Sequence, residues 1–535
     1  MNLLRRTALA FTASALAFSL NVVQADEVTP PSSANNSMMD QTNISAGNGM
    51  YGEQEGAAST ASFRRPTGIA IGASDDLYIS DTGNHKIRRL SSGTVSTYAG
   101  PSSSVLRDAG GQPLGALLNG SKASALFNTP AALAYGSDKS IYVADSGNNA
   151  IRKIAPSGAV VTIAGNGKIG AKDGKSTEAT FYQPQGIAVT NSGVIYVADT
   201  LNHVIRKITS DGTTSTLTAA SSRVVEHHPG LVLAAGDYKD GPINQALFNE
   251  PTGLVLDPKG NLYVSDSGNQ RIRYIDFATG EVTTIAGAPS AGGISVYSKN
   301  ALYATGSYKD GAAHAAAFYF PKGIALDESG GLLIADSLNH VVRYLKNGRV
   351  TTIAGSQSGE VGLQNVQGRT VLFNTPQDVA IASDGTIYVA DSGDNVIRKI
   401  APTTLSVDVN DRPSGIKVML GTEQIKFDAP PELKDGSVMV PIRQIAETLG
   451  YKTTFSPDGR TVSLVKDNRA IQLNPGSKSF TLKEASQVAS TGALNAAPYV
   501  NKNRVYVPLR FVAEQLGIDV KWSPETQTVI LDNNG

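Results

Sequence analysis

The chain has 535 residues, 41% of them apolar and 17% charged, which is typical of a globular protein and long enough for two or more domains. Its 46 basic residues balance its 46 acidic residues, so a nucleic-acid partner, which is held mainly by excess positive charge, is not expected. There is no cysteine, which excludes disulfides and thiol chemistry.

Residues 1–25 have the features of a secretory signal peptide. Arg5 and Arg6 provide positive charge, residues 7–20 form a short apolar stretch, and residues 23–25 offer a cleavage site. We therefore predict a secreted or envelope-associated protein, exported by the Sec or the twin-arginine route. An uncleaved anchor is the alternative, but a membrane span needs about 20 apolar residues. No later segment has that length, so no membrane span is expected after signal removal.

Six repeats of one template follow a linker expected at residues 26–42. Each repeat has a Phe, a Pro three residues later, an Asp fifteen residues after the Pro and an Arg seven residues after the Asp. These residues are Phe63, Pro66, Asp81 and Arg88; Phe127, Pro130, Asp145 and Arg152; Phe181, Pro184, Asp199 and Arg206; Phe248, Pro251, Asp266 and Arg273; Phe318, Pro321, Asp336 and Arg343; and Phe373, Pro376, Asp391 and Arg398. Because every repeat has the Asp and the Arg, we predict that they pair within the repeat and stabilise it.

The second repeat shows how one unit is built. Residues 131–135, 141–144, 150–154 and 160–164 are short runs rich in Ala, Ile, Val and Tyr, separated by clusters of Gly, Ser, Asp and Asn. Such runs predict four antiparallel strands. Four-stranded units repeated around an axis form a β-propeller. We therefore predict an all-β six-bladed propeller over residues 43–402, with each Pro at the start of an innermost strand.

The segments YVADSGNNAIRKI, YVADTLNHVIRKI and YVSDSGNQRIRYI each belong to one repeat, and they resemble NHL repeats. The resemblance covers about residues 43–402, and this family implies a six-bladed propeller. The sixth repeat departs from the pattern, because it has Asp394 where the others have Asn and it lacks a TIAG sequence after Arg398.

The start of the propeller region supplies a strand that the sixth repeat lacks. The sequence AGNG begins seventeen residues before Phe63, at the spacing found before Phe181. We predict that residues 43–47 pair with residues 395–400 and close the ring, which removes its free edges. The alternative is that residues 405–409, which alternate apolar and polar side chains, form that outer strand.

The loops differ in length at the two ends of the blades. Turns between strands one and two are short, whereas the blade-to-blade connections are long, and we call the end that carries them the long-loop face. The connections are residues 101–126, 166–180, 221–247, 288–317 and 356–372. Loops on a rigid scaffold usually carry binding residues, so we expect binding on this face. The candidate residues, in the turns after the repeated Asp, are Asn84, His85, Asn148, Asn202, His203, Asn269, Asn339 and His340.

Two kinds of metal site are alternatives on this face. His85, His203 and His340 share one repeat position, and a zinc lyase site would use three such ligands, as in the peptidyl amidating lyases among propeller relatives. Alternate blades keep these residues apart, which argues against zinc. A lactonase-like calcium site near the axis needs several acids, but only Asp378 is acidic among the residues that follow each Pro. We therefore expect no metal or other cofactor.

The chain after a linker at residues 403–415 contains an internal duplication. Residues 440–443, VPIR, recur as VPLR at 507–510, which is 67 residues later. Each copy predicts a short helix that starts near Pro and ends at Gly, followed by a β-hairpin. Residues 416–535 are therefore expected to form a small α+β domain.

This tail, about residues 416–533, resembles the copper amine oxidase N-terminal-like or stalk domain of exported bacterial proteins. Copper is not expected there, because no His follows His340 and imidazole and thiolate are the usual ligands. Together, the regions predict an exported, non-enzymatic binding or scaffolding protein of the cell envelope. Its partner would be a protein or a cell-wall ligand on the long-loop face, and a metal-dependent lyase or lactonase is the alternative function.

Overall fold

The computed structural model describes residues 41–103, 106–288, 296–356, 359–363, 371–401 and 416–533, the last range with short interruptions. The predicted signal peptide, the linker at 403–415 and the alternative outer strand at 405–409 lie outside these residues. No helix among the described residues is long and apolar enough to cross a membrane.

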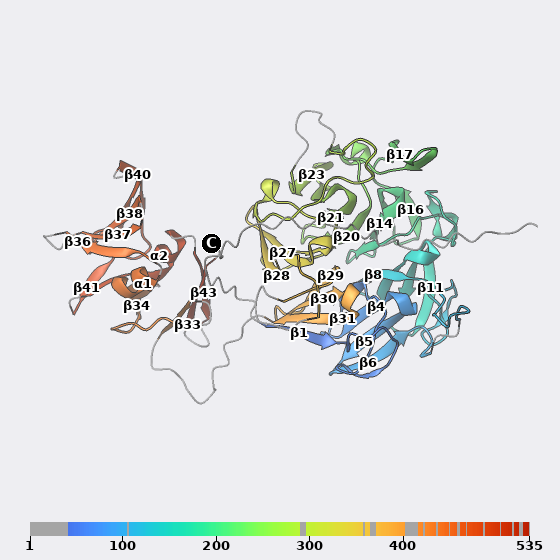
Figure 1. The fold of residues 1–535 in the computed structure, drawn as a ribbon, viewed down its shortest axis with the longest axis horizontal. Helices are drawn as coiled ribbons and strands as arrows, with labels where there is room; N and C mark the ends of the chain where they lie inside the picture. Colours follow the sequence, from blue (N-terminus) through green and yellow to red (C-terminus); the bar gives the residue numbers. More distant parts are fainter. Residues whose placement is uncertain are drawn as a thin grey trace, which may run out of the picture. The chain divides into compact units, whose positions relative to one another are not determined.

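In the part of the chain that the structure describes, six antiparallel sheets form the propeller (Figure 1). The strands of a blade follow one another outward from the axis in chain order, except at the outer edge, where each sheet ends with a strand that comes from an earlier part of the chain. The innermost strands are β3 (Gly68–Ile71), β8 (Pro130–Tyr135), β13 (Gly186–Val189), β20 (Pro251–Leu256), β25 (Pro321–Leu326) and β29 (Pro376–Ile381). Each contacts the innermost strand of both neighbouring blades, and the series runs from β3 to β29 and back to β3. The blades therefore form a closed ring of six.

The second and third strands of each blade carry the repeated Asp and Arg. The second strands are β4 (Leu77–Asp81), β9 (Ile141–Asp145), β14 (Ile195–Asp199), β21 (Leu262–Asp266), β26 (Leu332–Asp336) and β30 (Ile387–Asp391). The third strands are β5 (Lys86–Ser91), β10 (Ala150–Ile154), β15 (Val204–Ile208), β22 (Arg271–Asp276), β27 (Val341–Lys346) and β31 (Val396–Ala401). The strands predicted for the second repeat are confirmed to within one residue at each end.

Outer strands complete the sheets. The fourth strands of blades one to five are β6 (Thr94–Ala99), β11 (Ala159–Ala164), β16 (Thr213–Thr216), β23 (Glu281–Ala286) and β28 (Arg349–Ala354). Five sheets also have a short fifth strand that the sequence did not predict: β2 (Gly56–Ala57), β7 (Gly120–Ser121), β12 (Gly174–Lys175), β19 (Gly241–Pro242) and β24 (Gly311–Ala312). It arises because each connection pairs for two residues with the exposed edge of the fourth strand.

The ring closes through the predicted pairing of two distant segments. Strand β1 (Gln41–Ala46) lies antiparallel to β31, and the register places Thr42 opposite Ile400 and Ala46 opposite Ile397. In Figure 1, β1 in blue lies beside β31 in orange. Thr42 and Ala46 are buried. The sixth blade is thus completed by the start of the propeller region, which confirms the predicted closure.

The described residues of the tail form three sheets and two short helices. Its strands are β32 (Lys417–Leu420), β33 (Glu423–Gln424), β34 (Glu432–Lys434), β35 (Ser437–Pro441), β36 (Lys452–Phe455), β37 (Val462–Lys466), β38 (Arg469–Leu473), β39 (Ser479–Glu484), β40 (Gln487–Ala493), β41 (Tyr499–Asn501), β42 (Arg504–Pro508), β43 (Ile518–Ser523) and β44 (Thr528–Asn533). The helices α1 (Ile442–Thr448) and α2 (Leu509–Gln515) each begin directly after a Pro and are followed by a hairpin, as predicted.

The duplication is visible in the packing of the tail. Strands β35 and β42 pair antiparallel, and Val440 lies opposite its repeat equivalent Val507. Both are fully buried in one apolar cluster that contains residues of both copies, including Ile442 and Leu509. The two copies therefore share a single core.

Candidate functional site

The connections and the turns after the repeated Asp lie at the same end of the blades. Each turn is a short 3₁₀ helix, such as η1 (Thr82–Asn84) and η6 (Ser267–Asn269). Backbone hydrogen bonds tie these turns to the residues that precede the innermost strands: the N–H of Gly83 donates to the carbonyl of Arg64, and that of Gly268 to Asn249, both at 2.8 Å. The long-loop face is therefore the end at which the innermost strands begin.

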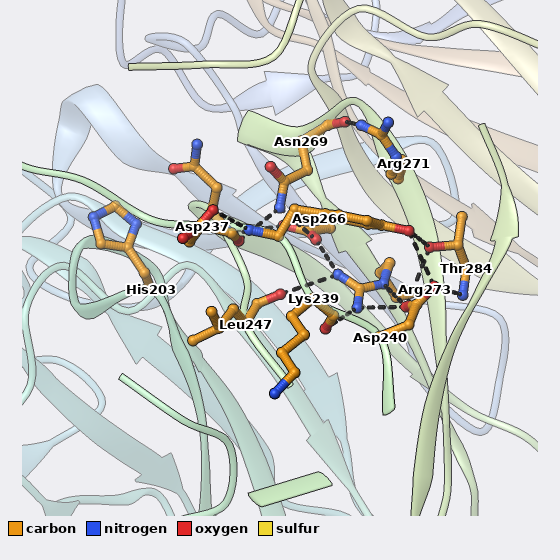
Figure 2. Close-up of polar contacts among 12 residues, drawn as sticks. His203, Asp237, Lys239, Asp240, Leu247, Asp266, Asn269, Arg271, Arg273 and Thr284 are labelled. Atoms are coloured by element: carbon orange, nitrogen blue, oxygen red, sulfur yellow. Dashed lines mark hydrogen bonds and ion pairs between the residues drawn. The ribbon is translucent and has the colours of Figure 1, made fainter. Parts of the chain in front are cut away.

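The repeated Asp and Arg form fully buried ion pairs in all six blades, at N···O distances of 2.6–2.9 Å. Figure 2 shows the pair in blade four, where Arg273 contacts Asp266 at 2.6 Å and also donates to the carbonyls of Leu247 and Lys239. The ring of Phe248 lies 4.7 Å from the guanidinium. The same contacts recur around the ring, so the Asp and Arg residues stabilise the fold, as predicted.

The five Asn candidates belong to this network. The Nδ2 of Asn84, Asn148, Asn202, Asn269 and Asn339 donates to the Asp of the same blade at 2.8–2.9 Å and also to a carbonyl of the preceding connection. In the sixth blade Asp394 replaces the Asn, and Arg398 contacts both Asp391 and Asp394. These amides fasten each turn to its connection.

A second acid on the connection was missed by the sequence analysis. Asp173, Asp240 and Asp310 each pair with the Arg of their blade at 2.6–2.7 Å. Each also accepts a hydrogen bond from a Thr of strand four, such as Thr284 in Figure 2. A sequence pattern could have identified them, because each of these residues begins an Asp-Gly pair eight residues before the repeated Phe.

The three His candidates connect neighbouring blades and do not come together. The Nδ1 of His85 accepts the backbone N–H of Thr129 (2.9 Å), that of His203 accepts Glu250 N–H (3.1 Å), and that of His340 accepts Thr375 N–H (3.1 Å). In the other blades the same bond is accepted by Asn149, Asn395 and Gln270. We call the residue at this position the inter-blade latch.

The latch accepts a hydrogen bond from a residue that has an unusual backbone conformation. Every residue before the repeated Pro has a φ between 44° and 51°, in the left-handed region that side chains other than Gly rarely adopt: Arg65, Thr129, Gln183, Glu250, Phe320 and Thr375. The bond from the latch fixes the N–H of each. An Nδ1 that accepts a hydrogen bond requires a neutral imidazole. Burial favours the neutral form, because it lowers the pKa of His203 to about 4. Each His therefore has a structural role at a separate blade junction.

No group of three or more His, Asp or Glu side chains in the described part of the chain is placed to hold a metal ion. Asp378 lies at the axis, but its carboxylate accepts the backbone N–H groups of Ile69 and Val379, both at 2.9 Å. It thereby joins the innermost strands of blades six and one. Burial raises the pKa of Asp378 to about 7.

Exposed apolar side chains lie on each of the connections into blades six, one, two and three. Tyr51 and Ile169, at the equivalent position of two connections, are 53% and 63% exposed. Leu363 lies against Gly49 in the neighbouring connection, and Leu117 lies against Gly167. We define the apolar band as Met50, Tyr51, Leu114, Leu117, Ile169 and Leu363. Such exposed apolar surface is typical of protein-binding sites.

The connections before blades four and five are locked to each other. The guanidinium of Arg223 donates to the carbonyls of Gly236, Ala301 and Leu302 and lies 3.6 Å from the ring of Tyr297. The hydroxyl of Tyr303 donates to Glu250 at 2.8 Å. The described parts of these two connections are thus joined by side-chain contacts.

Comparison with known proteins identifies both regions. Family models match an NHL repeat at residues 63–90, 127–154, 248–273 and 373–400, a teneurin NHL domain at residues 164–237 and a copper amine oxidase N-terminal domain at residues 419–531. The chain therefore carries an NHL-repeat propeller followed by a copper amine oxidase N-terminal domain.

Several known proteins are similar to the propeller region. "Protein SUPPRESSOR OF QUENCHING 1, chloroplastic" of Arabidopsis thaliana is 29% identical over 56% of this chain and 26% of its own length. NHL repeat-containing protein 2 of Bos taurus is 28% identical over 57% of this chain and 42% of its own length. The chain thus spans less than half of these relatives. An auxiliary nutrient binding protein of Bacteroides thetaiotaomicron VPI-5482 aligns with a TM-score of 0.47 and 14% identity over 68% of this chain and 76% of that structure.

Proposed function

We propose that this protein is an exported, non-enzymatic binding protein whose propeller holds a protein partner on the long-loop face. The apolar band carries this proposal. The repeated polar residues of the face are engaged within the fold, whereas Met50 and Ile169 expose well over half of their side-chain surface. Covering such side chains by a partner removes apolar surface from water, which favours association.

The tail supports a role at the cell envelope. Its resemblance to a stalk-type domain of exported proteins and the signal-like residues 1–25 suggest that it attaches the propeller to the envelope while the long-loop face binds. Its core is separate from the apolar clusters of the propeller blades. Binding and attachment would then be properties of different domains.

Capture from an envelope extract tests the proposal. We expect the propeller to retain a partner, and the double variant Tyr51→Asp/Ile169→Asp to lose it, because both side chains lie in the apolar band. Val161→Asp is the matched control: Val161 is 44% exposed but lies on strand β11, outside the band. Equal capture by all three proteins would contradict the proposal, and stoichiometric zinc or calcium in the purified protein would favour a metal-dependent enzyme.

A further inference from the structure

Two layers of side chains surround the propeller axis where the innermost strands begin. The residues directly after each repeated Pro form the axial ring: Thr67, Ala131, Gln185, Thr252, Lys322 and Gln377. Two positions further along the strands lies an aliphatic floor: Ile69, Leu133, Ile187, Leu254, Ile324 and Val379. Together with Ala132, Gly253, Gly323 and Asp378, they line a cavity of about 100 Å³.

Most polar groups of the axial ring are already engaged. The hydroxyls of Thr67 and Thr252 bond to Thr82 and Ser267 at 2.6 Å, and the amide of Gln377 donates to Ser337 at 2.9 Å. Lys322 and Gln185 differ. Among the residues that the structure describes, neither side chain has a hydrogen bond or an ion pair, although both line the cavity.

Lys322 is the one charged member of the axial ring, and its side chain is partly buried. The Phe320 ring lies 5.7 Å from its Nζ. Burial lowers the pKa of Lys322, and the nearby carboxylate of Glu250 only partly opposes that shift. Glu250 is itself bonded to Tyr303 and lies outside the 4.0 Å limit of an ion pair with Lys322. An anion in the cavity would complete the solvation of the ammonium.

The size and charge of the cavity favour a small anion with a single negative charge. Just below the ring the innermost strands lie close together: a Cβ on Gly186 would lie 1.7 Å from the carbonyl oxygen of Thr252, and one on Gly323 would lie 1.9 Å from the Asp378 carboxylate. A cavity smaller than the ~150 Å³ that holds benzene takes a group of a few atoms, not a sugar ring or a nucleotide. The cavity has one cation, Lys322, and is also lined by the carboxyl group of Asp378, with Glu250 near Lys322. A single negative charge therefore fits better than a phosphate dianion.

We propose that the axial ring is a carboxylate-binding site, in which Lys322 pairs with the carboxylate, the Gln185 amide donates to it and the aliphatic floor excludes water. The carboxylate comes either from a small aliphatic acid or from the C-terminal end of a peptide chain. Both present the same group to Lys322. The site is distinct from the apolar band. A failure of carboxylate binding would therefore leave the proposed protein partner untouched, and the reverse also holds.

Calorimetric titration of the full-length protein tests this site with propionate, N-acetylglycylglycine and the C-terminal amide of that dipeptide. Lys322→Gln removes the cation with little risk to the fold, because Gln stands at the same ring position in blades three and six. Gln185→Lys adds a second cation. Lys309→Gln is the control, since Lys309 is exposed on a connection.

We expect millimolar binding of a carboxylate, at least tenfold weaker binding by Lys322→Gln, at least threefold tighter binding by Gln185→Lys and no change in Lys309→Gln. Propionate binding would identify a small acid, and binding of the dipeptide acid alone would identify a chain terminus; either supports the site. Equal binding of acid and amide, tighter binding of inorganic phosphate, unchanged binding by Lys322→Gln, or no carboxylate binding by the native protein would overturn the proposal.

Discussion

Acidification should weaken the propeller at the His203 latch, and the structure sets the size of the effect. The Nδ1 of His203 accepts the N–H of Glu250 only while the imidazole is neutral. Burial lowers the pKa of His203 to about 4, against about 6.5 in an unfolded chain. Between these values the unfolded state binds more protons, so the stabilisation is complete above pH 6.5 and is lost as the pH falls towards 4. From pH 7.5 to 4.5 the loss is about 2.5 kcal/mol.

The variant His203→Asn isolates this contribution. Asn occupies the latch in blades two and six and accepts the same bond at 2.8 and 3.0 Å, so we expect nearly native stability at pH 7.5. At pH 4.5 the variant should be more stable than the native protein by about 2.5 kcal/mol, because the carboxamide does not titrate. Urea unfolding at both pH values measures the difference. An identical pH dependence in the two proteins would refute the role of His203.

Three further predictions concern the propeller and the tail. Removal of residues 26–46 takes away strand β1, so it should destabilise the propeller by several kcal/mol and expose the edge of β31; unchanged urea unfolding and monodisperse light scattering would contradict the closure. Asp199→Ala removes the fully buried partner of Arg206, which keeps its contact with Asp173, and should cost about 2 kcal/mol without loss of partner capture; loss of capture at unchanged stability would show instead that Asp199 serves binding. A fragment of residues 416–535 should unfold cooperatively by circular dichroism, because its core contains both copies of the duplication; a gradual melt would show that it depends on the propeller.

The regular part of the fold could be predicted because it repeats. Fixed spacings between Phe, Pro, Asp and Arg located the strands and the ion pairs, and the seventeen-residue spacing before Phe63 located the closing strand β1. The 67-residue offset likewise located both tail helices. In each case one pattern, seen several times, outweighs the uncertainty of any single segment.

Other features could not be read from local patterns. The left-handed residue before each Pro contradicts the usual preference of that position for extended backbone, and it depends on a latch from the neighbouring blade. Likewise, the sequence groups His85, His203 and His340 by repeat position, but only the closed ring shows that they serve three different junctions. Contacts between blades are long-range, so residue spacing within one repeat does not reveal them.

The structure shows which repeated residues have partners within the fold and which unrepeated residues do not. This distinction separates structural residues from candidates for ligand binding, and the sequence alone does not provide it. The Asp, Arg, Asn and latch side chains are found in every blade or nearly every blade, and each has a partner within the fold. Lys322 occurs once, at a ring position where the other blades have neutral side chains, and no residue of the described chain satisfies its charge. The side chain is partly buried at the cavity and lies beside the ring of Phe320, so an anion that enters the cavity would be the partner that the fold does not supply.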